Sequence, residues 1–304
     1  MQKKIVRRQV DGVLLLDKPK GLSSNHALQA AKRYLNAAKA GHTGTLDPMA
    51  TGLLPLTFGE ATKFSQMLLE ADKTYEATVS LGVVTDTGDA EGKVLEQRLV
   101  DVRMDELIAA LRAFRGEIEQ VPPMYSALKR DGKPLYEYAR AGIEVERTPR
   151  RVTIHQLELL DGGLAEDRFR LRVRCSKGTY VRTLAMDIGW ALGCGAHLSA
   201  LRRTAIGAFS IEQAVSIERI ESCALRERDE LLAPPDMLVS HLEAIQLDEL
   251  QAHATLQGRV LNLEKCSKPG LVRLYANGRF IGLGEINEGG RLSPKRLIAT
   301  GADV

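Results

Sequence analysis

Residues 41–56 read GHTGTLDPMATGLLPL, and the interpretation of the whole chain starts from them. The stretch combines three glycines and two prolines with small polar residues, so it cannot form one regular element. We expect a structured loop that leads into a short helix. Asp47 is its only carboxylate, and Pro48 restricts the backbone of Asp47 to extended conformations. Asp47 either caps a helix that starts at Pro48 or takes part in chemistry, and the spacing alone favours the cap.

Hydrophobic patterns predict the elements on either side of this loop. We expect strands at residues 12–20 and 73–84, and helices at about 23–38, 60–71 and 104–115. Strands and helices mix without a regular βαβα alternation, here and further along the chain. This organisation is typical of an α+β fold.

Residues 122–151 differ from their surroundings. They hold four prolines, three tyrosines, and seven Lys or Arg against four acidic residues. This composition predicts an exposed basic insertion. Strands at about 152–161 and 168–176 and a helix at 179–192 follow it.

The last part of the chain has a different pattern. Pro234 and Pro235 mark a boundary, and short strand patterns begin beyond about residue 247. Residues 271–286 predict a hairpin with Asn277-Gly278 at its turn. We therefore expect two domains, at residues 1–246 and 247–304, of which the second is a small β-barrel.

Composition excludes several classes of protein. The 304 residues are 44% hydrophobic and 27% charged with a net charge of +3, which is ordinary for a globular chain and excludes a disordered, collagenous or coiled-coil one. No apolar run approaches the ~18 residues that span a bilayer. The histidines form no HxxxH or HxH pair, the glycines form no GxGxxG or Walker loop, and the cysteines form no CxxC pair, so we expect neither a metal nor a nucleotide cofactor. So few cysteines fit a cytoplasmic location; they are Cys175, Cys194, Cys223 and Cys266.

Basic residues gather in the segment RFRLRVRCSKGTYVR, residues 168–182. Its first four arginines alternate with Phe169, Leu171, Val173 and Cys175, so a strand here has one apolar face and one row of guanidinium groups. That row is either a solvated outer face or a phosphate-binding strip. The phosphate-binding interpretation is favoured by further basic residues nearby in the sequence, namely Arg202-Arg203 and those of 129–151.

Five segments in the same order resemble the TruB family of tRNA pseudouridine synthases, and the resemblance spans roughly residues 10–300. Besides 41–56 they are VLLLDKPKGLSS at 13–24, KTYEATVSLG at 73–82, RCSKGTYVRTLAMDIG at 174–189 and HLSALRRTAIGAF at 197–209. The tail, with LVRLYANGRFIGLGEI at 271–286 and SPKRL at 293–297, resembles the PUA RNA-binding module. The resemblance implies a mixed, mainly antiparallel sheet flanked by helices, followed by a small PUA-type β-barrel.

The family's reaction moves uracil from an N1 to a C5 glycosidic bond, which needs no redox cofactor and no metal. Asp47 matches the family's nucleophile, and a carboxylate suits the labilisation of the glycosidic bond. Arg182 matches the residue that pairs with this carboxylate, and a cation there would keep it ionised. Tyr75 matches the tyrosine that stacks on the target base and handles the C5 proton. These three residues are the expected catalytic set.

The resemblance also implies substrate-binding residues. Tyr180 and Leu201 match residues that line the uracil pocket. His42 matches a residue that fills the space left by the flipped base, and flipping is required because a stacked base hides both C5 and C1′. Lys18 and Pro19 match a motif that packs near the catalytic loop. Expected contacts to the RNA backbone are Arg174, Lys177, Arg202, Arg203, Lys129 and Arg130.

We expect an isomerase that acts on uridine 55 in the T-loop of tRNA. The T-arm of tRNA is then its partner, and neither a protein partner, a membrane nor oligomerisation is expected. Two alternatives remain open: a guide-RNA-dependent pseudouridine synthase subunit, and an RNA-binding or tRNA-folding module with incidental activity. The basic insertion and the compact tail favour the stand-alone enzyme, and the joint presence of Asp47, Tyr75 and Arg182 favours an enzyme over a binder.

Overall fold

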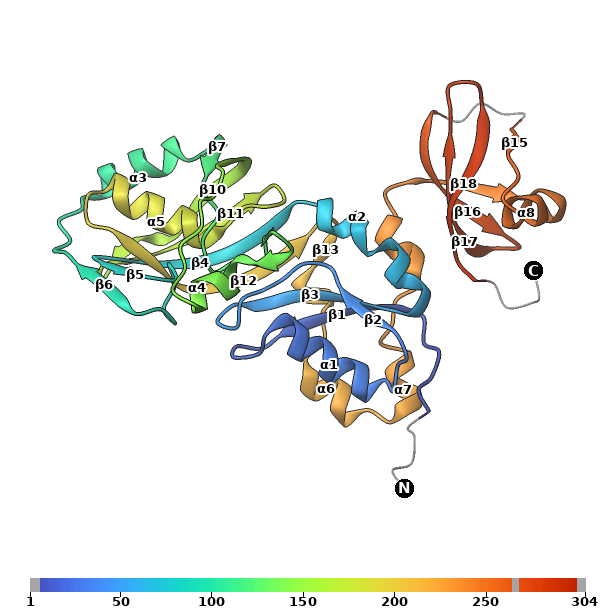
Figure 1. Cartoon of the computed structure of the whole chain (residues 1–304), viewed down its shortest axis with the longest axis horizontal. Coiled ribbons are helices and arrows are strands. Elements are labelled where there is room, and N and C mark those ends of the chain that lie inside the picture. The colour runs from blue at the N-terminus through green and yellow to red at the C-terminus, as the bar shows by residue number, and fades with distance from the viewer. Residues whose placement is uncertain (1–5, 264–267, 300–304) are drawn as a thin grey trace.

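The structure is a computed structural model that describes residues 6–263 and 268–299. Figure 1 shows a large part, built on one sheet with helices around it, and a smaller C-terminal part beyond the 3₁₀ helix at Pro235–Val239. Cys266 and Lys265 lie outside the described residues. Among the described residues, no helix is both long and apolar enough to cross a membrane.

A nine-stranded sheet forms the centre of the large part. Its neighbours are antiparallel except for one parallel pair, so the expected mixed, mainly antiparallel sheet is confirmed. Seven strands follow one path: β1 (Gly12–Lys18), β3 (Thr51–Phe58), β12 (Ala196–Ile206), β4 (Lys73–Leu81), β11 (Arg168–Cys175), β10 (Arg150–Ala165) and β7 (Gly116–Gln120). Two short strands join it from the side, β2 (Ala40–His42) on β3 and β13 (Phe209–Ser210) on β12. The parallel pair is β3 with β12.

Helices cover both ends of this sheet (Figure 1). One group lies beside β1 and β2: α1 (Ser24–Tyr34), α6 (Ile217–Ser222) and α7 (Leu225–Asp229). A second group lies at the other end: α3 (Met104–Ala113), α5 (Val181–Ala191) and the insertion helix α4 (Leu135–Arg140). The Ser23 side chain caps α1 by accepting a hydrogen bond from the His26 backbone. The remaining elements are the 3₁₀ helices Gly59–Phe64 and Ile211–Gln213, α2 (Ser65–Glu70), and the hairpins β5 (Val83–Thr85) with β6 (Val94–Gln97) and β8 (Lys129–Arg130) with β9 (Lys133–Pro134).

The expected short helix after the Asp47 loop is wrong, because Thr51–Phe58 is the interior strand β3. Pro55 argued against a strand, since proline lacks the N–H of a ladder hydrogen bond. The Pro55 carbonyl accepts a hydrogen bond from the Thr43 backbone N–H. The ring nitrogen of Pro55 faces the same side of the strand as this carbonyl, and that side lies beyond the end of β2. The missing N–H of Pro55 therefore costs no hydrogen bond of the ladder. Gly52 allows the backbone of β12 to lie close to β3, because a Cβ on Gly52 would lie only 2.3 Å from the Arg203 carbonyl oxygen.

The C-terminal part is a five-stranded sheet with one helix. Its strand order is β14 (Glu243–Leu247), β16 (Gly270–Ala276), β17 (Arg279–Ile286), β18 (Arg291–Leu297) and β15 (Leu261–Asn262), with α8 (Glu249–Leu256) beside it. The expected hairpin is confirmed, and both Asn277 and Gly278 have positive φ, as a type I′ turn requires. The boundary expected after residue 246 falls within β14, so we propose that the C-terminal part starts at about residue 243. This sheet starts at Glu243, whose strand pattern is too short to stand out from the preceding loop.

The two parts are joined by packed side chains as well as by the chain. The rings of Phe64 and Phe280 have centroids 5.3 Å apart. The Lys63 ammonium donates to the Leu297 carbonyl at 2.8 Å, and the Arg296 guanidinium donates to the Lys63 carbonyl at 2.6 Å. The C-terminal sheet therefore supports the 3₁₀ helix Gly59–Phe64, which follows β3.

Candidate active site

The Asp47 loop connects β2 to β3 and is fixed from both sides. The Ser24 hydroxyl accepts from the Leu46 backbone N–H at 2.7 Å and donates to the Leu46 carbonyl at 3.0 Å. The Gly21 backbone donates to the Pro48 carbonyl at 2.8 Å. No helix starts at Pro48, so the interpretation of Asp47 as a helix cap is wrong.

Lys18 is the buried support beneath this loop. Its side chain is fully buried, and its ammonium donates to the carbonyls of Pro19 at 2.9 Å, Leu22 at 2.6 Å and Pro48 at 3.5 Å. Burial lowers the pKa of Lys18 to about 8, against the opposite effect of the Asp47 charge. Lys18 thus ties the end of β1 to the residue that follows Asp47.

Lys18→Met is expected to slow the chemical step by ~10–100-fold, because a catalytic group displaced by about 1 Å loses that much rate. Single-turnover kinetics at saturating enzyme measure the rate, and thermal melts measure stability. Arg115→Met is the matched control, since Arg115 also holds a backbone carbonyl, that of Leu157, at 2.7 Å in another part of the fold. A rate for Lys18→Met within twofold of that of the control would show that the loop does not depend on Lys18.

Asp47 and Arg182 form an ion pair at the start of α5. The Arg182 Nε lies 3.0 Å from Asp47 Oδ2 and 3.6 Å from Asp89 Oδ2. The other two nitrogens of Arg182 donate to the carbonyls of Thr87 at 2.8 Å and Tyr125 at 2.7 Å. Every guanidinium nitrogen is therefore engaged, and the side chain is only 5% exposed. The Asp47 side chain keeps 36% of its surface exposed.

The electrostatics of Asp47 depend on this pair. Burial raises the pKa of Asp47 above its ordinary value, Arg182 lowers it, and the neighbouring Asp89 raises it further. Arg182 is thus the group that most strongly favours the ionised carboxylate, which is the form that acts as a nucleophile.

A pocket of about 340 Å³ brings together five of the residues expected at the site. They are Asp47, Tyr75, Tyr180, Arg182 and Leu201, from the loop, β4, the start of α5 and β12. His42 lies outside this pocket and lines a neighbouring one of about 500 Å³, which Asp47 and Arg182 also line. The Asp47–Arg182 pair therefore lies on the wall shared by the two pockets. The 500 Å³ pocket is also lined by residues of the insertion, among them Tyr136 and Arg140.

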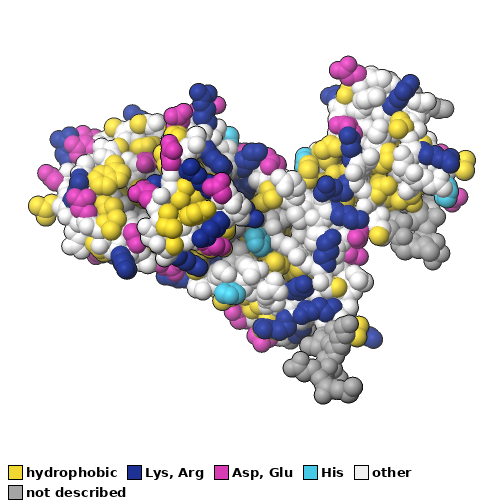
Figure 2. All heavy atoms as spheres, in the orientation of Figure 1, with side chains coloured by type: hydrophobic (Ala, Val, Ile, Leu, Met, Phe, Trp, Pro, Cys, Tyr) yellow, Lys and Arg dark blue, Asp and Glu magenta, His cyan; other side chains and the backbone are white. Residues whose placement is uncertain are grey.

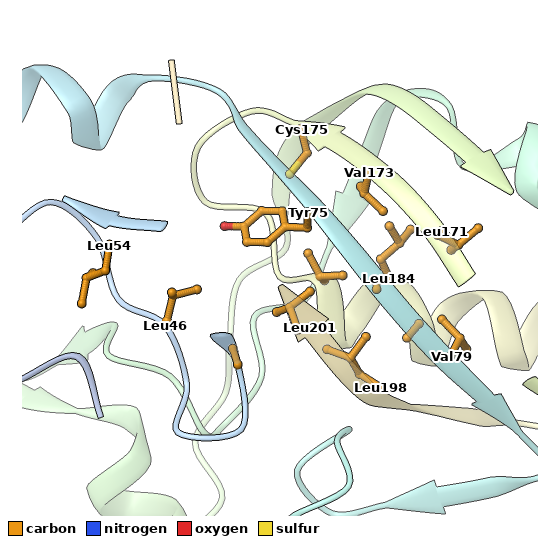
Figure 3. Packing of buried hydrophobic residues seen from close by; sticks show 14 of the residues in the cluster. Leu46, Leu54, Tyr75, Val79, Leu171, Val173, Cys175, Leu184, Leu198 and Leu201 are labelled. Atoms are coloured by element: carbon orange, nitrogen blue, oxygen red, sulfur yellow. The ribbon is translucent and has the colours of Figure 1, made fainter. Parts of the chain in front are cut away.

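Tyr75 sits at the edge of the apolar core. Figure 3 shows its ring directed away from Val79 and Leu171, with its hydroxyl toward the side where Leu46 and Leu54 lie. The residue is 9% exposed, and burial raises the pKa of its hydroxyl, while Arg203 lowers it. An apolar wall with a hydroxyl at its rim suits a flat base.

Tyr180 stands at the N-terminus of α5. The side-chain amide of Gln120 brackets its backbone, accepting from the Tyr180 N–H at 3.0 Å and donating to the Tyr180 carbonyl at 3.3 Å. Burial raises the pKa of the Tyr180 hydroxyl. Gln120 thereby holds the turn that leads into Arg182.

The basic strip on β11 alternates as expected, with Phe169, Leu171, Val173 and Cys175 buried. Its arginines face neighbouring carboxylates: Arg170 and Arg172 each lie 3.2 Å from Glu76, and Arg174 lies 3.2 Å from Asp72. Figure 2 shows Lys and Arg side chains across the middle of the face drawn there, interspersed with Asp and Glu. The strip is thus partly neutralised.

The remaining residues expected at the RNA backbone have different environments. Lys177 pairs with Glu70, and Arg202 pairs with Asp17 at 2.7 Å. Lys129 is exposed on the insertion, and Arg130 donates to the Glu146 carbonyl. These four stay predictions.

Arg203 does not fit its expected role at the RNA backbone. The residue is 1% exposed and points inward to line the 340 Å³ pocket. Strand alternation explains the error, because adjacent residues of β12 face opposite sides of the sheet and only Arg202 faces out.

Two residues that support the site were not predicted from the sequence. Asp89 had no predicted role, and Lys73 was expected only at the start of a strand. Asp89 is buried beside Arg182, and the buried Lys73 ammonium donates to the carbonyls of Leu68, Leu69 and Ala71. No spacing pattern marks either one. Among the described residues, no group of three or more His, Cys, Asp or Glu could hold a metal ion.

Comparison with known proteins places the chain in a family. Family models match three segments: "TruB family pseudouridylate synthase (N terminal domain)" at residues 32–181, "tRNA pseudouridylate synthase B C-terminal domain" at 182–257, and "Pseudouridine synthase II TruB, C-terminal" at 244–298. Among similar proteins, "tRNA pseudouridine synthase B" of Aromatoleum aromaticum is 66% identical over 97% of this chain and 94% of its own length. The protein of the same name from Azoarcus sp. (strain BH72) is 64% identical over 99% of each chain.

Solved structures show the same fold. "Crystal Structure of a Cbf5-Nop10-Gar1 Complex" matches with 29% identity and a TM-score of 0.69, over 92% of this chain and 79% of that one. "Structure of H/ACA RNP bound to a substrate RNA containing 2'-deoxyuridine" matches with 26% identity and a TM-score of 0.71, over 95% and 85%.

The mixed sheet and the pocket that it carries define an α+β pseudouridine synthase, which is an isomerase. Within that class, the chain belongs to the TruB family.

Proposed function

We propose that this enzyme isomerises uridine 55 in the T-loop of tRNA to pseudouridine, as a stand-alone enzyme. The observation that carries the proposal is the pairing of Asp47 with Arg182, 3.0 Å apart, in one pocket with Tyr75. The name shared by the bacterial relatives at 64–66% identity supports tRNA as the substrate.

The pocket residues divide the reaction between them. The flipped uridine lies against Leu201 and Tyr75, and the Asp47 carboxylate labilises the N1–C1′ bond by covalent addition or by helping to expel the base. The freed uracil turns and bonds to C1′ through C5. Tyr75 then takes the proton from C5, the electron pair of that C–H bond restores the C5=C6 double bond, and N1, freed from C1′, takes up a proton from water. No electron is gained or lost in the sum.

The experiment that tests this proposal uses a full-length tRNA transcript with no guide RNA and no other protein. We expect pseudouridine at position 55 and at no other uridine, and none in a transcript with cytidine at that position. Product only after addition of a guide RNA would support the guide-dependent alternative. Faster refolding of a misfolded transcript without any product would support the RNA-folding alternative.

The C-terminal sheet is expected to bind RNA beyond the T-loop. Residues 247–304 hold eight Lys or Arg against six acidic residues. Truncation would also remove Phe280 from Phe64, so a full-length charge variant is the cleaner test. Replacing the exposed Arg259, Arg279 and Arg291 with Gln should lower the slope of log K against log salt by about 0.7–0.9 for each phosphate that these arginines neutralise.

For that variant, KM for full-length tRNA should rise, while the saturated single-turnover rate stays within about threefold of the wild-type rate, because the pocket is intact. A T-arm hairpin should be affected less than whole tRNA. A hundredfold lower saturated rate on both RNAs would show instead that this sheet helps to build the active site.

A further inference from the structure

We propose that Arg203 is a further positioning residue of the reaction, a buried cation with no carboxylate partner among the described residues, which orients the Tyr75 hydroxyl and stabilises negative charge on it as the C5 proton is removed. This inference rests on the proposed function and adds to it a residue outside the expected catalytic set.

Backbone pairing places Arg203 beside Tyr75. β12 and β4 are antiparallel neighbours, and Arg203 and Tyr75 are partners in their register. Partners across a strand pair project to the same face, so both side chains point into the pocket that they line. The guanidinium also reaches the Asp47 loop, since a Cβ on Gly44 would lie 3.6 Å from Arg203 Nη1. Arg203 therefore lies between the catalytic loop and Tyr75.

The charge of Arg203 has no partner among the described residues. Its Nε donates to the Leu53 carbonyl at 2.7 Å, but its Nη2 is buried and makes no hydrogen bond to any of them. Two other arginines differ from Arg203, because Arg182 in the same pocket pairs with Asp47, and Arg202 on the opposite side of β12 pairs with Asp17. Burial of an unpaired cation is unfavourable, so a purely structural role explains it poorly. An oxygen that becomes negative during the reaction would explain it.

The surrounding groups leave Arg203 as the main influence that favours a negative Tyr75 oxygen. Burial raises the pKa of Tyr75, and so do the charges of Cys175 on β11 and Asp47 on the loop. Arg203 alone among the leading influences lowers it, through its positive charge. The same positive charge lowers the pKa of Lys73, which is on the Tyr75 strand, and of Lys18 on β1.

Removal of the C5 proton by Tyr75 requires stabilisation of the negative Tyr75 oxygen. Tyr75 can take a proton only if its own hydroxyl proton has passed to water. The phenolate oxygen then accepts the C5 proton, and the pair of electrons from the C–H bond stays in the ring. A fixed guanidinium lowers the energy of the phenolate without moving during the reaction.

The test compares Arg203→Met and Arg203→Lys with wild type and with Arg228→Met. Arg228 is the matched control, since it too holds backbone carbonyls, those of Ile220 and Tyr34, away from the pocket. The readouts are single-turnover rates on T-arm hairpins with hydrogen or deuterium at C5 of the target uridine, between pH 6 and 9, together with thermal melts. This pH range lies below the ordinary tyrosine pKa of about 10.

We expect Arg203→Met to lose at least about tenfold in rate, less than the ~100–10,000-fold that the general base itself supplies, because Arg203 acts only through Tyr75. Its deuterium isotope effect should be larger than that of wild type, and its rate should rise more steeply with pH, because proton removal now limits the rate. Arg203→Lys, which keeps a cation, should recover part of the rate. Arg228→Met should keep the wild-type rate and isotope effect.

Two outcomes would overturn the proposal. One is a rate for Arg203→Met within threefold of the wild-type rate. The other is a slower rate with an unchanged isotope effect and pH dependence, which is the pattern of a purely structural defect. If Arg203→Met does not fold, the isotope effect and pH dependence of Arg203→Lys decide in the same way. Failure of the proposed function is seen separately, as a wild-type enzyme that forms no pseudouridine on the hairpin.

Discussion

Asp47→Asn is expected to abolish pseudouridine formation while RNA binding persists. The amide is nearly isosteric with the carboxylate, so the loop held by Ser24 and Lys18 keeps its shape. An amide is a poor nucleophile and carries no negative charge, so the step that labilises the glycosidic bond is lost. We expect the saturated single-turnover rate to fall at least about 1,000-fold, as loss of a nucleophile does in other enzymes.

The binding measurement is the control for Asp47→Asn. Its Kd for the T-arm hairpin should stay within about threefold of the wild-type value, since Asp47 is a single carboxylate at the pocket wall and makes no phosphate contact. Residual turnover within tenfold of wild type would exclude Asp47 as the nucleophile. Loss of turnover together with loss of binding would show that Asp47 holds the RNA.

Tyr75→Phe is expected to keep binding and to lose ~100–10,000-fold in the chemical step, the range that a general acid or base supplies. The ring survives in the variant, and with it the stacking on the flipped base, which is worth ~1–3 kcal/mol. The hydroxyl at the rim of the pocket does not survive. Saturated single-turnover rates and Kd for the hairpin separate the two contributions.

Tyr75→Leu is the companion variant for the ring. It should bind the hairpin more weakly than Tyr75→Phe, because it loses the aromatic surface as well as the hydroxyl. If Tyr75→Phe instead weakens binding tenfold and leaves the chemical rate unchanged, Tyr75 serves only as a platform for the base.

Hydrophobic pattern predicted four of the nine strands of the large sheet, namely β1, β4, β10 and β11. The strand at 168–176 and the helix at 179–192 follow from local periodicity, and the structure confirms both as β11 and α5. The strand β3 was missed because Gly52 and Pro55 are local signals against regular structure. Both are tolerated for reasons that lie elsewhere in the chain: the close approach of β12 at Gly52 and the open side of the ladder at Pro55.

For the candidate site too, local sequence predicted some residues, and the tertiary structure decided the others. Asp47, Tyr75 and Arg182 were found because each stands in a motif that resembles a family, and the structure brings them into one pocket. Arg203 was assigned to the surface because a pair of adjacent arginines does not reveal which one faces inward. That depends on the register of β12 against β4, which no local pattern contains.

The most direct measurement of the central claim is tritium release from a T-arm hairpin labelled at C5 of the target uridine. It uses excess enzyme, no guide RNA and EDTA in the buffer, with wild type and Asp47→Asn side by side. The account predicts complete release by the wild type, matched by pseudouridine in the RNA, and release below about one thousandth of the wild-type rate by the variant. No release by the wild type, or equal release by both, would contradict it.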